Sequence, residues 1–263
     1  MEVAVEAARE RLRGVVRETP VLEAGELSRI AGGRVVLKAE CLQLTGSFKV
    51  RGAHNKLAVL GDGGIGRGVV ASSAGNHAQA VSLAATRAGA RAVVYMPAGA
   101  PLSKVAAVER YGGEVRLVPG AYDDAAAAAL EASEAEGLTL VHPFDDLDVI
   151  AGQATVGVEL AAQVPDLGTV VVPIGGGGLV SGVAVALKER IPGVRVVGVQ
   201  AEARASGTIC DGIAVKRPGE LTGRLIAEHV DEIVTVGDDE VAQAMVLLLE
   251  RSKLVVEGAG AVG

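Results

Sequence analysis

The sequence predicts an α/β protein whose parallel β-sheets are covered by helices on both faces. Short apolar, β-branched runs alternate along the chain with Ala-rich stretches of helical length. The runs lack the polar and apolar alternation of a half-exposed strand, so both faces of the strands are expected to be buried. The 263 residues are 49% hydrophobic and 22% charged, which allows a sizeable core and excludes a disordered chain.

The expected strands are rich in Val and Ile and are bounded by turn residues or helical stretches. They are Arg34–Lys38, Gly68–Ser72, Ala92–Met96, Glu114–Val118, Thr139–Val141, Thr169–Pro173, Arg195–Gln200 and Glu232–Val236. The expected helices lie between them and are rich in Ala and Leu. They are Ser47–Leu60, Asn76–Ala88, Leu102–Tyr111, Tyr122–Glu136, Leu147–Gln163, Leu179–Arg190 and Asp239–Lys253. Regular alternation of the two kinds of element defines the α/β class.

The segment Gly61–Gly68 has the composition of a flexible turn and is a candidate hinge. Gly61, Gly63 and Gly66 match the GxGxxG pattern of nucleotide-binding loops. Such a loop follows a strand and opens a helix, whereas this segment follows a helix and precedes a strand. A turn is therefore the favoured interpretation.

A run of four glycines, Gly175-Gly176-Gly177-Gly178, lies between the strand Thr169–Pro173 and the helix beginning at Leu179. Backbone N–H groups of such a loop can converge on an anion, and the helix N-terminus adds partial positive charge. The alternative, a merely tight turn, needs fewer glycines. The run has no Lys-Ser/Thr ending, so it is not an ATP-binding P-loop. We expect it to bind a phosphate.

Lys49 lies in the first turns of a helix that Thr45 or Ser47 can cap. The helix dipole at this end and the like charge of Arg51 both favour the neutral amine, which is the form that makes a Schiff base. The alternative is a solvated surface lysine, the more common fate of a single lysine.

A second strand-to-helix junction occurs at Ser72–Ala78. Ser73, Asn76 and the backbone N–H groups there can receive a carboxylate or a phenolic oxygen. Considered alone, the segment is more typical of a helix cap, and His77 of a structural histidine.

Several classes of protein have no support in the sequence. There is no HExxH, GxSxG or paired-carboxylate arrangement, which removes the basis for a metal hydrolase or a serine hydrolase. A net charge of −7 argues against a nucleic-acid partner, and no apolar stretch is long enough to span a membrane. The first residues lack an apolar signal core, and Cys41 and Cys210 lie far apart, so a reduced cytoplasmic protein is expected.

Several longer stretches accompany these motifs. They are LKAECLQLTGSFKVRGA, ASSAGNHAQA, HPFDDLDVIAGQAT, VVVPIGGGGLVSG, GVQAE, TICDGIAV and VVEGAGAVG. From Thr19-Pro20-Val21 to the end of the chain, they resemble the fold-type II pyridoxal-phosphate enzymes, the tryptophan synthase β-like fold. The resemblance is to the threonine/serine dehydratase (ammonia-lyase) branch, with serine racemase as close kin.

The resemblance implies two parallel-rich open sheets in two domains. Residues 1–66 and 146–263 would form a discontinuous large domain that binds pyridoxal 5'-phosphate, and residues 67–145 a small one, with the site in the cleft between them. Lys49 would be the Schiff-base lysine. Other roles follow: Gly175, Gly176, Gly177, Gly178 and Leu179 around the cofactor phosphate, Asn76 on its 3′-oxygen, Phe48 beside its ring, and Ser73, Asn76 and His77 on the substrate carboxylate.

The chain departs from the family pattern in two places. The C-terminal segment of the family whose serine or cysteine bonds the pyridine nitrogen is not expected within this sequence, which ends at Gly263. The connection Ala203–Gly207 is also shorter than in the family. Glu202 matches a position that can help to hold a divalent cation, although its partners would belong to the missing stretch.

The activity implied is β-elimination of L-threonine and L-serine to 2-oxobutanoate or pyruvate and ammonia, in a homodimer or homotetramer that binds a small amino acid. One alternative is a serine racemase, although Ala74 stands where racemases have a second proton-transferring serine. Another is an inactive remnant that still binds the cofactor. A nicotinamide dehydrogenase is a distant third, because neither glycine loop has both the right spacing and the right context.

Overall fold

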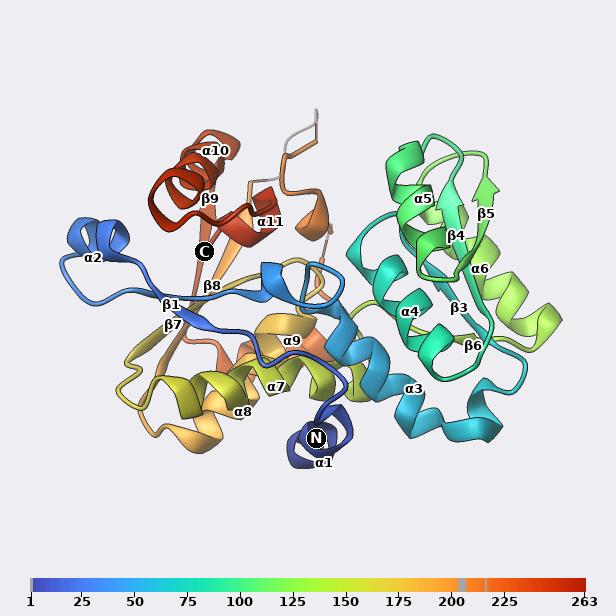
Figure 1. The fold of residues 1–263 in the computed structure, drawn as a ribbon, viewed down its shortest axis with the longest axis horizontal. Helices are drawn as coiled ribbons and strands as arrows, with labels where there is room; N and C mark the ends of the chain where they lie inside the picture. The colour runs from blue at the N-terminus through green and yellow to red at the C-terminus, as the bar shows by residue number, and fades with distance from the viewer. Residues whose placement is uncertain (1, 203–206, 216) are drawn as a thin grey trace.

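A computed structural model describes residues 2–202, 207–215 and 217–263. The α/β class is confirmed, with two separate parallel sheets, each accompanied by its own helices (Figure 1). The long helix α3 (Lys49–Ile65) runs between the two groups. Within the described residues, no helix has the length and apolar character to cross a bilayer.

The first sheet has the strand order β5-β4-β3-β6, and all its neighbouring strands are parallel. Alternate side chains of β4 point to opposite faces. Val94 and Met96 pack with α4 and α5, whereas Val93 and Tyr95 pack with α6. The elements are β3 (Val69–Ser72), β4 (Ala92–Pro97), β5 (Glu114–Val118), β6 (Thr139–Leu140), α4 (Asn76–Arg87), α5 (Leu102–Arg110) and α6 (Tyr122–Glu136).

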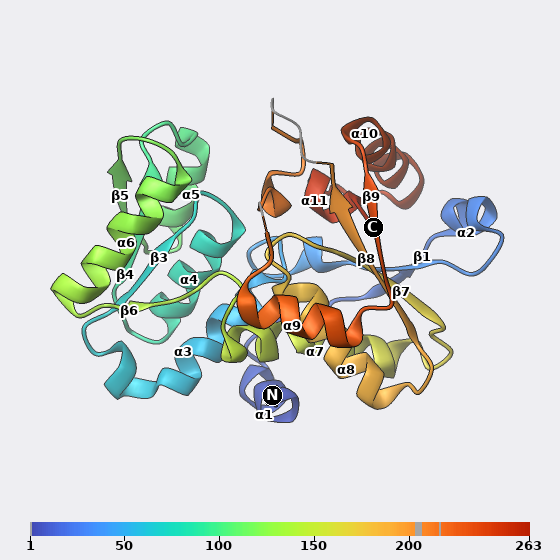
Figure 2. The same ribbon diagram turned by 180° about the vertical axis from the view of Figure 1, so that it is seen from behind.

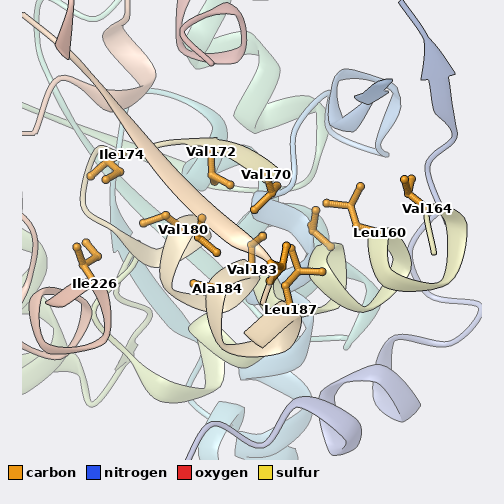
Figure 3. Packing of buried hydrophobic residues seen from close by; sticks show 13 residues of the cluster. Leu160, Val164, Val170, Val172, Ile174, Val180, Val183, Ala184, Leu187 and Ile226 are labelled. Atoms are coloured by element: carbon orange, nitrogen blue, oxygen red, sulfur yellow. The ribbon is translucent and has the colours of Figure 1, made fainter. Parts of the chain in front are cut away.

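The second sheet has the parallel order β7-β8-β9. Its main core, drawn in Figure 3, joins Val170 and Val172 of β7 to apolar side chains of α7, α8 and α9. Figure 2 shows these helices along one side of the strands. The elements are β7 (Thr169–Pro173), β8 (Arg195–Ala201), β9 (Glu232–Val236), α7 (Leu147–Gln163), α8 (Gly178–Arg190) and α9 (Glu220–His229).

The opposite face of this sheet is covered less completely. Val199 packs with side chains of α10 (Asp238–Leu247) and α11 (Gly258–Ala261). Val171 of β7 and Val234 of β9, whose side chains lie on this face, are 45% and 36% exposed. The expectation that the strands are buried on both faces is therefore wrong for parts of β7 and β9, because the helices on this side do not reach them.

A buried ion-pair network fixes the start of α3. The Arg51 side chain has no exposed surface and binds Glu40 of η1 (Glu40–Leu42) and Glu159 of α7 at 2.8 and 2.5 Å. Lys38 also binds Glu159 at 2.5 Å. Buried charges require such partners, because an unpaired one carries a large desolvation cost. The network therefore anchors the helix that carries Lys49.

The strand expected at Arg34–Lys38 is β2 (Val36–Lys38), but the sequence missed its antiparallel partner β1 (Val21–Glu23). A strand of three residues gives a short pattern that is easily overlooked. Several helices were missed too, since they are short or bury few side chains. They are α1 (Val5–Leu12), α2 (Gly25–Ala31), α9, α11 and η2 (Asp211–Ile213).

Two expected boundaries are also wrong. The turn expected at Gly61–Gly68 is a kink at Gly61, whose φ of 58° favours glycine, after which α3 continues to Ile65. The helix expected over Asp239–Lys253 ends at Leu247 and passes into the π-helical turn η3 (Leu248–Ser252). Both features are local deviations that periodicity alone does not reveal.

Candidate active site

Lys49 opens α3 and is half-buried. Its Nζ donates a hydrogen bond to the Pro143 carbonyl oxygen at 2.8 Å and lies 5.5 Å from the centre of the Phe48 ring. Burial lowers the pKa of Lys49 to about 8. A substantial fraction of this amine is therefore neutral near physiological pH, as a nucleophile or a base requires.

The environment of Lys49 corrects two details. Phe48, not Thr45 or Ser47, occupies the N-cap position of α3, and no side chain caps the helix. The charge of Arg51 is bound by two glutamates, and burial alone lowers the pKa of Lys49. The direction expected for the amine is confirmed, but its cause is desolvation rather than the neighbouring arginine.

The segment from His142 to Asp145 joins Lys49 to the glycine run, and from the sequence it was noted only within the stretch HPFDDLDVIAGQAT, with no role predicted for it. The Nδ1 atom of His142 accepts hydrogen bonds from the backbone N–H groups of Phe144 and Asp145 at 3.3 and 2.7 Å. Burial lowers the pKa of His142, which keeps the ring neutral and able to accept. The resulting turn presents the Pro143 carbonyl to Lys49. Its position just beyond β6, at the carboxyl edge of a parallel sheet, is the signal that was overlooked.

The glycine run lies between β7 and α8, as expected. A Cβ on Gly176 would lie 2.2 Å from the Phe144 ring, and one on Gly175 would lie 2.8 Å from Cα of Ile213. Gly177 has a φ of 92°, which disfavours other residues. The first N–H groups of α8, from Gly178 onward, have no partner within the helix. Close packing on one side and N–H groups at the helix start make this loop a suitable anion cradle.

A second set of bonds holds the cradle in place. The Asp145 carboxylate accepts from the backbone N–H groups of Glu220 and Thr222 at 3.1 and 3.0 Å. The Thr222 hydroxyl donates to the Gly176 carbonyl oxygen at 2.7 Å. The start of α9 is thereby fixed to the glycine run, and Phe48 and Leu179 border the same apolar core.

The start of α4 carries the proposed carboxylate-binding residues. The Ser73 hydroxyl accepts a hydrogen bond from the Gly75 N–H at 3.1 Å, which leaves its own O–H able to donate. The ring of His77 is buried, and its Nε2 lies 2.9 Å from the Val141 carbonyl oxygen. Burial, with a contribution from the Lys49 charge, lowers the pKa of His77 to about 3. Its side chain is therefore structural, and its backbone N–H is what the helix start offers a ligand.

Asn76 and Glu257 meet across the two halves of the structure. The Asn76 Nδ2 donates to Oε1 of Glu257 at 2.7 Å. Partial desolvation raises the pKa of Glu257. The sequence singled out Asn76 but gave no role to Glu257, which lies in the quoted stretch VVEGAGAVG, because nothing local shows that the two residues meet.

Glu202 follows β8 and borders a shallow hollow with Asp239 and Glu240. Among the described residues, no group of three or more His, Cys, Asp or Glu side chains is placed to hold a metal ion. Most of the connection Ala203–Gly207 lies outside the described residues, since these exclude 203–206.

The sequence matches the family model described as "Pyridoxal-phosphate dependent enzyme" over residues 12–263. The L-threonine ammonia-lyase of Thermotoga maritima is 48% identical, with 98% of this chain and 69% of the relative covered. The catabolic L-threonine dehydratase TdcB of Escherichia coli K12 is 45% identical, with 97% and 82% covered.

Solved structures show the same likeness. Maize serine racemase superimposes with a TM-score of 0.95 at 35% identity, with 98% of this chain and 83% of that chain covered. The processed form of threonine deaminase isoform 2 from Solanum lycopersicum gives a TM-score of 0.94 at 36% identity, with 98% and 76% covered.

Proposed function

The chain belongs to the pyridoxal-phosphate dependent enzymes, and from that membership we propose that it is an L-threonine ammonia-lyase that also accepts L-serine. It would convert these to 2-oxobutanoate or pyruvate and ammonia. The observation that carries the proposal is Lys49, a half-buried amine with a pKa lowered to about 8, joined to a glycine cradle by the turn at Pro143 and Phe144.

The residues present fit pyridoxal 5'-phosphate. The cradle at Gly175–Gly178 offers helix-start N–H groups to a phosphate. Three buried hydroxyls near the ends of the segments that form the site, those of Thr45, Ser47 and Ser72, have no hydrogen-bond partner in the part of the chain that the structure describes. Buried polar groups without partners are rare and are consistent with a polar ligand.

We assign the holding groups as follows. Lys49 would attach the cofactor through its Nζ, with Phe48 beside the ring and Asn76 on the 3′-oxygen. The phosphate would bind at Gly175, Gly176, Gly177, Gly178 and Leu179. When bound, pyridoxal phosphate supplies an electron sink for the negative charge that develops at the substrate Cα.

The chain's own groups supply the remaining chemistry. Lys49 Nζ, neutral in part because of its lowered pKa, accepts the proton from the substrate Cα. The Ser73 hydroxyl and the backbone N–H groups of Asn76 and His77 bind the substrate carboxylate at the start of α4, where the helix dipole favours an anion. These contacts orient the Cα–H bond toward Lys49.

Further assignments accompany this activity as proposals. The domain division is 1–66 with 146–263 and 67–145, and the small domain closes one side of the site. We propose that the protein is cytoplasmic and forms a homodimer or homotetramer. Light scattering on purified protein checks the oligomeric state. A divalent cation near Glu202 is the remaining proposal, and a change in melting temperature on adding Mg²⁺ or Mn²⁺, absent in Glu202→Ala, tests it.

Borohydride reduction of the cofactor-loaded protein tests the central assignment. Peptide mapping is expected to find the cofactor label on Lys49, and Lys49→Ala to lose threonine turnover while keeping its circular dichroism spectrum. Label on Lys38 or Lys56 would contradict the assignment. Both are bound in ion pairs, to Glu159 and to Asp146, and serve as internal controls.

A further inference from the structure

The hydrogen bond between Asn76 and Glu257 joins groups 181 residues apart in the sequence. Asn76 is the first residue of α4, beside the first sheet, and Glu257 is the N-cap residue of α11, beside the second. Within the described parts of the chain, neither Asn76 Nδ2 nor Glu257 Oε1 makes another hydrogen bond that competes with this one. The contact therefore links the proposed cofactor-binding amide to the opposite half of the protein.

The backbone around Glu257 holds its carboxylate in place. A Cβ on Gly258 would lie 2.5 Å from the Ile209 carbonyl oxygen, and one on Gly212 would lie 3.2 Å from Oε1 of Glu257. The start of α11 is thus packed tightly against the segment that contains η2. Charged neighbours also act on the carboxyl: Asp211 raises its pKa and Lys104 lowers it, and these two residues bind each other at 2.6 Å.

An asparagine amide has two different ends, and rotation by 180° exchanges the NH₂ group with the oxygen. A carboxylate can only accept hydrogen bonds, so it attracts the NH₂ group and repels the amide oxygen. The observed bond therefore selects one of the two orientations of Asn76. One N–H of Nδ2 is used, and the second N–H remains available to another acceptor.

We propose that Glu257 is a positioning residue that fixes the Asn76 amide with its NH₂ group available to the cofactor's 3′-oxygen. This inference rests on the proposed function, in which Asn76 contacts that oxygen. Glu257 itself need not touch the cofactor. Without Glu257, the amide would be free to turn its oxygen toward an oxygen that also accepts, which weakens cofactor binding.

The dissociation constant of pyridoxal phosphate, measured by equilibrium dialysis on cofactor-free protein, tests the proposal. Glu257→Ala is expected to raise this constant about tenfold, the effect of losing one hydrogen bond to a charged group. Glu257→Asp, which withdraws the carboxylate by one carbon, is expected to raise it about as much. Glu257→Gln keeps an oxygen that can accept the bond and is expected to stay within about threefold of the unmodified protein.

A double-mutant cycle separates positioning from direct contact. If Glu257 acts through Asn76, then Asn76→Ala and the double variant Asn76→Ala/Glu257→Ala will have the same dissociation constant. A higher dissociation constant in the double variant than in Asn76→Ala would overturn the proposal. An unchanged constant in Glu257→Ala would also overturn it. An unchanged dissociation constant in Glu257→Asp, together with a raised one in Glu257→Gln, would show that the negative charge matters rather than the hydrogen bond to Asn76. That result would also overturn the proposal.

Controls distinguish this result from a general effect on the fold. Glu250→Ala, at an exposed glutamate of η3, is expected to change neither the constant nor the melting temperature. The melting temperature of cofactor-free Glu257→Ala is expected to match that of the unmodified protein. If the unmodified protein fails to bind pyridoxal phosphate, the proposed function fails. If it binds the cofactor and turns over threonine while Glu257→Ala is indistinguishable from it, only the role of Glu257 fails.

Discussion

Burial of Lys49 sets the protonation of its amine, and therefore its reactivity. The amine lies at the start of α3, and its desolvation lowers the pKa to about 8. The Pro143 carbonyl accepts one of its hydrogens at 2.8 Å and fixes the position of Nζ. The residue is thus held in place while remaining easy to deprotonate.

This pKa predicts the pH dependence of cofactor loading. Because only the neutral amine attacks an aldehyde, the loading rate should rise about tenfold per pH unit below pH 8 and level off above it. Stopped-flow absorbance of cofactor-free protein mixed with pyridoxal phosphate measures this rate. A plateau reached only near the ordinary pKa of lysine, 10.5, would contradict the lowered value.

Ala74 predicts lyase rather than racemase chemistry. Racemisation needs a second proton-transferring group on the face of the substrate opposite Lys49. Alanine has no exchangeable proton, and Ala74 packs against the apolar cluster that contains Ala78 and Met96. The protein should therefore form pyruvate from L-serine with little D-serine, and Ala74→Ser should introduce slow racemisation. Chiral chromatography decides this, and D-serine appearing as fast as pyruvate in the unmodified protein would refute the lyase assignment.

Among the elements, the junction of β7 and α8 combines close packing with an unpaired helix start. The glycines permit both, because their neighbours Phe144 and Ile213 leave no room for a Cβ at Gly176 and Gly175. The same packing places the loop against the segment that receives Lys49. The cradle and the lysine are therefore positioned by one shared stretch, the turn between β6 and α7.

Substitution of Gly176 should show that cofactor binding depends on the close packing of the glycine run against Phe144. Gly176→Val would push its side chain into the Phe144 ring and displace the loop, so cofactor affinity should fall at least about a hundredfold. Gly63→Val is the matched control, because a Cβ at Gly63 has nothing within 4 Å. Equal losses of affinity in the two variants, measured by dialysis, would mean that the phosphate site is located wrongly.

At the scale of the whole molecule, the buried charges around Arg51 connect the N-terminal segment, α3 and α7. Arg51 donates to the Arg17 carbonyl oxygen as well as to Glu40 and Glu159. Burial by itself would lower the pKa of Arg51, but the two glutamates raise it, so the side chain stays charged throughout the accessible pH range. The orientation of the helix that carries Lys49 thus depends on contacts from three distant parts of the chain.

Removal of the Arg51 side chain should destabilise the fold. Arg51→Ala removes the ion-pair partner of Glu40 and one of the two partners of Glu159 in a buried place, and the free energy of unfolding should fall by about 3–5 kcal/mol. Arg29→Ala breaks the exposed pair with Glu26 and should lower the free energy of unfolding far less, because water screens an exposed pair. Urea denaturation of both cofactor-free variants checks this, and similar losses in the two would argue against the network's role.

The sequence by itself determined the α/β class, most of the longer helices and the parallel strands. These follow from periodicity and from residue preferences, which act over a few neighbouring residues. Lys49, Asn76 and the glycine run were singled out because each lies at a junction with a distinctive local pattern, and the roles predicted for them came from the resemblance to the family. The pairing of β1 with β2 and the kink at Gly61 were not found, since a three-residue strand and a single backbone angle leave too weak a pattern.

Only the tertiary structure decided which groups surround Lys49 and Asn76. The neutralisation of Arg51, the bond from Lys49 to the Pro143 carbonyl and the bond from Asn76 to Glu257 all join segments far apart in the chain. Desolvation likewise depends on every element that packs around a group, so the cause of the low pKa of Lys49 appears only after folding. Local sequence places the reactive residues at the ends of helices and strands, and long-range packing sets their charge, orientation and partners.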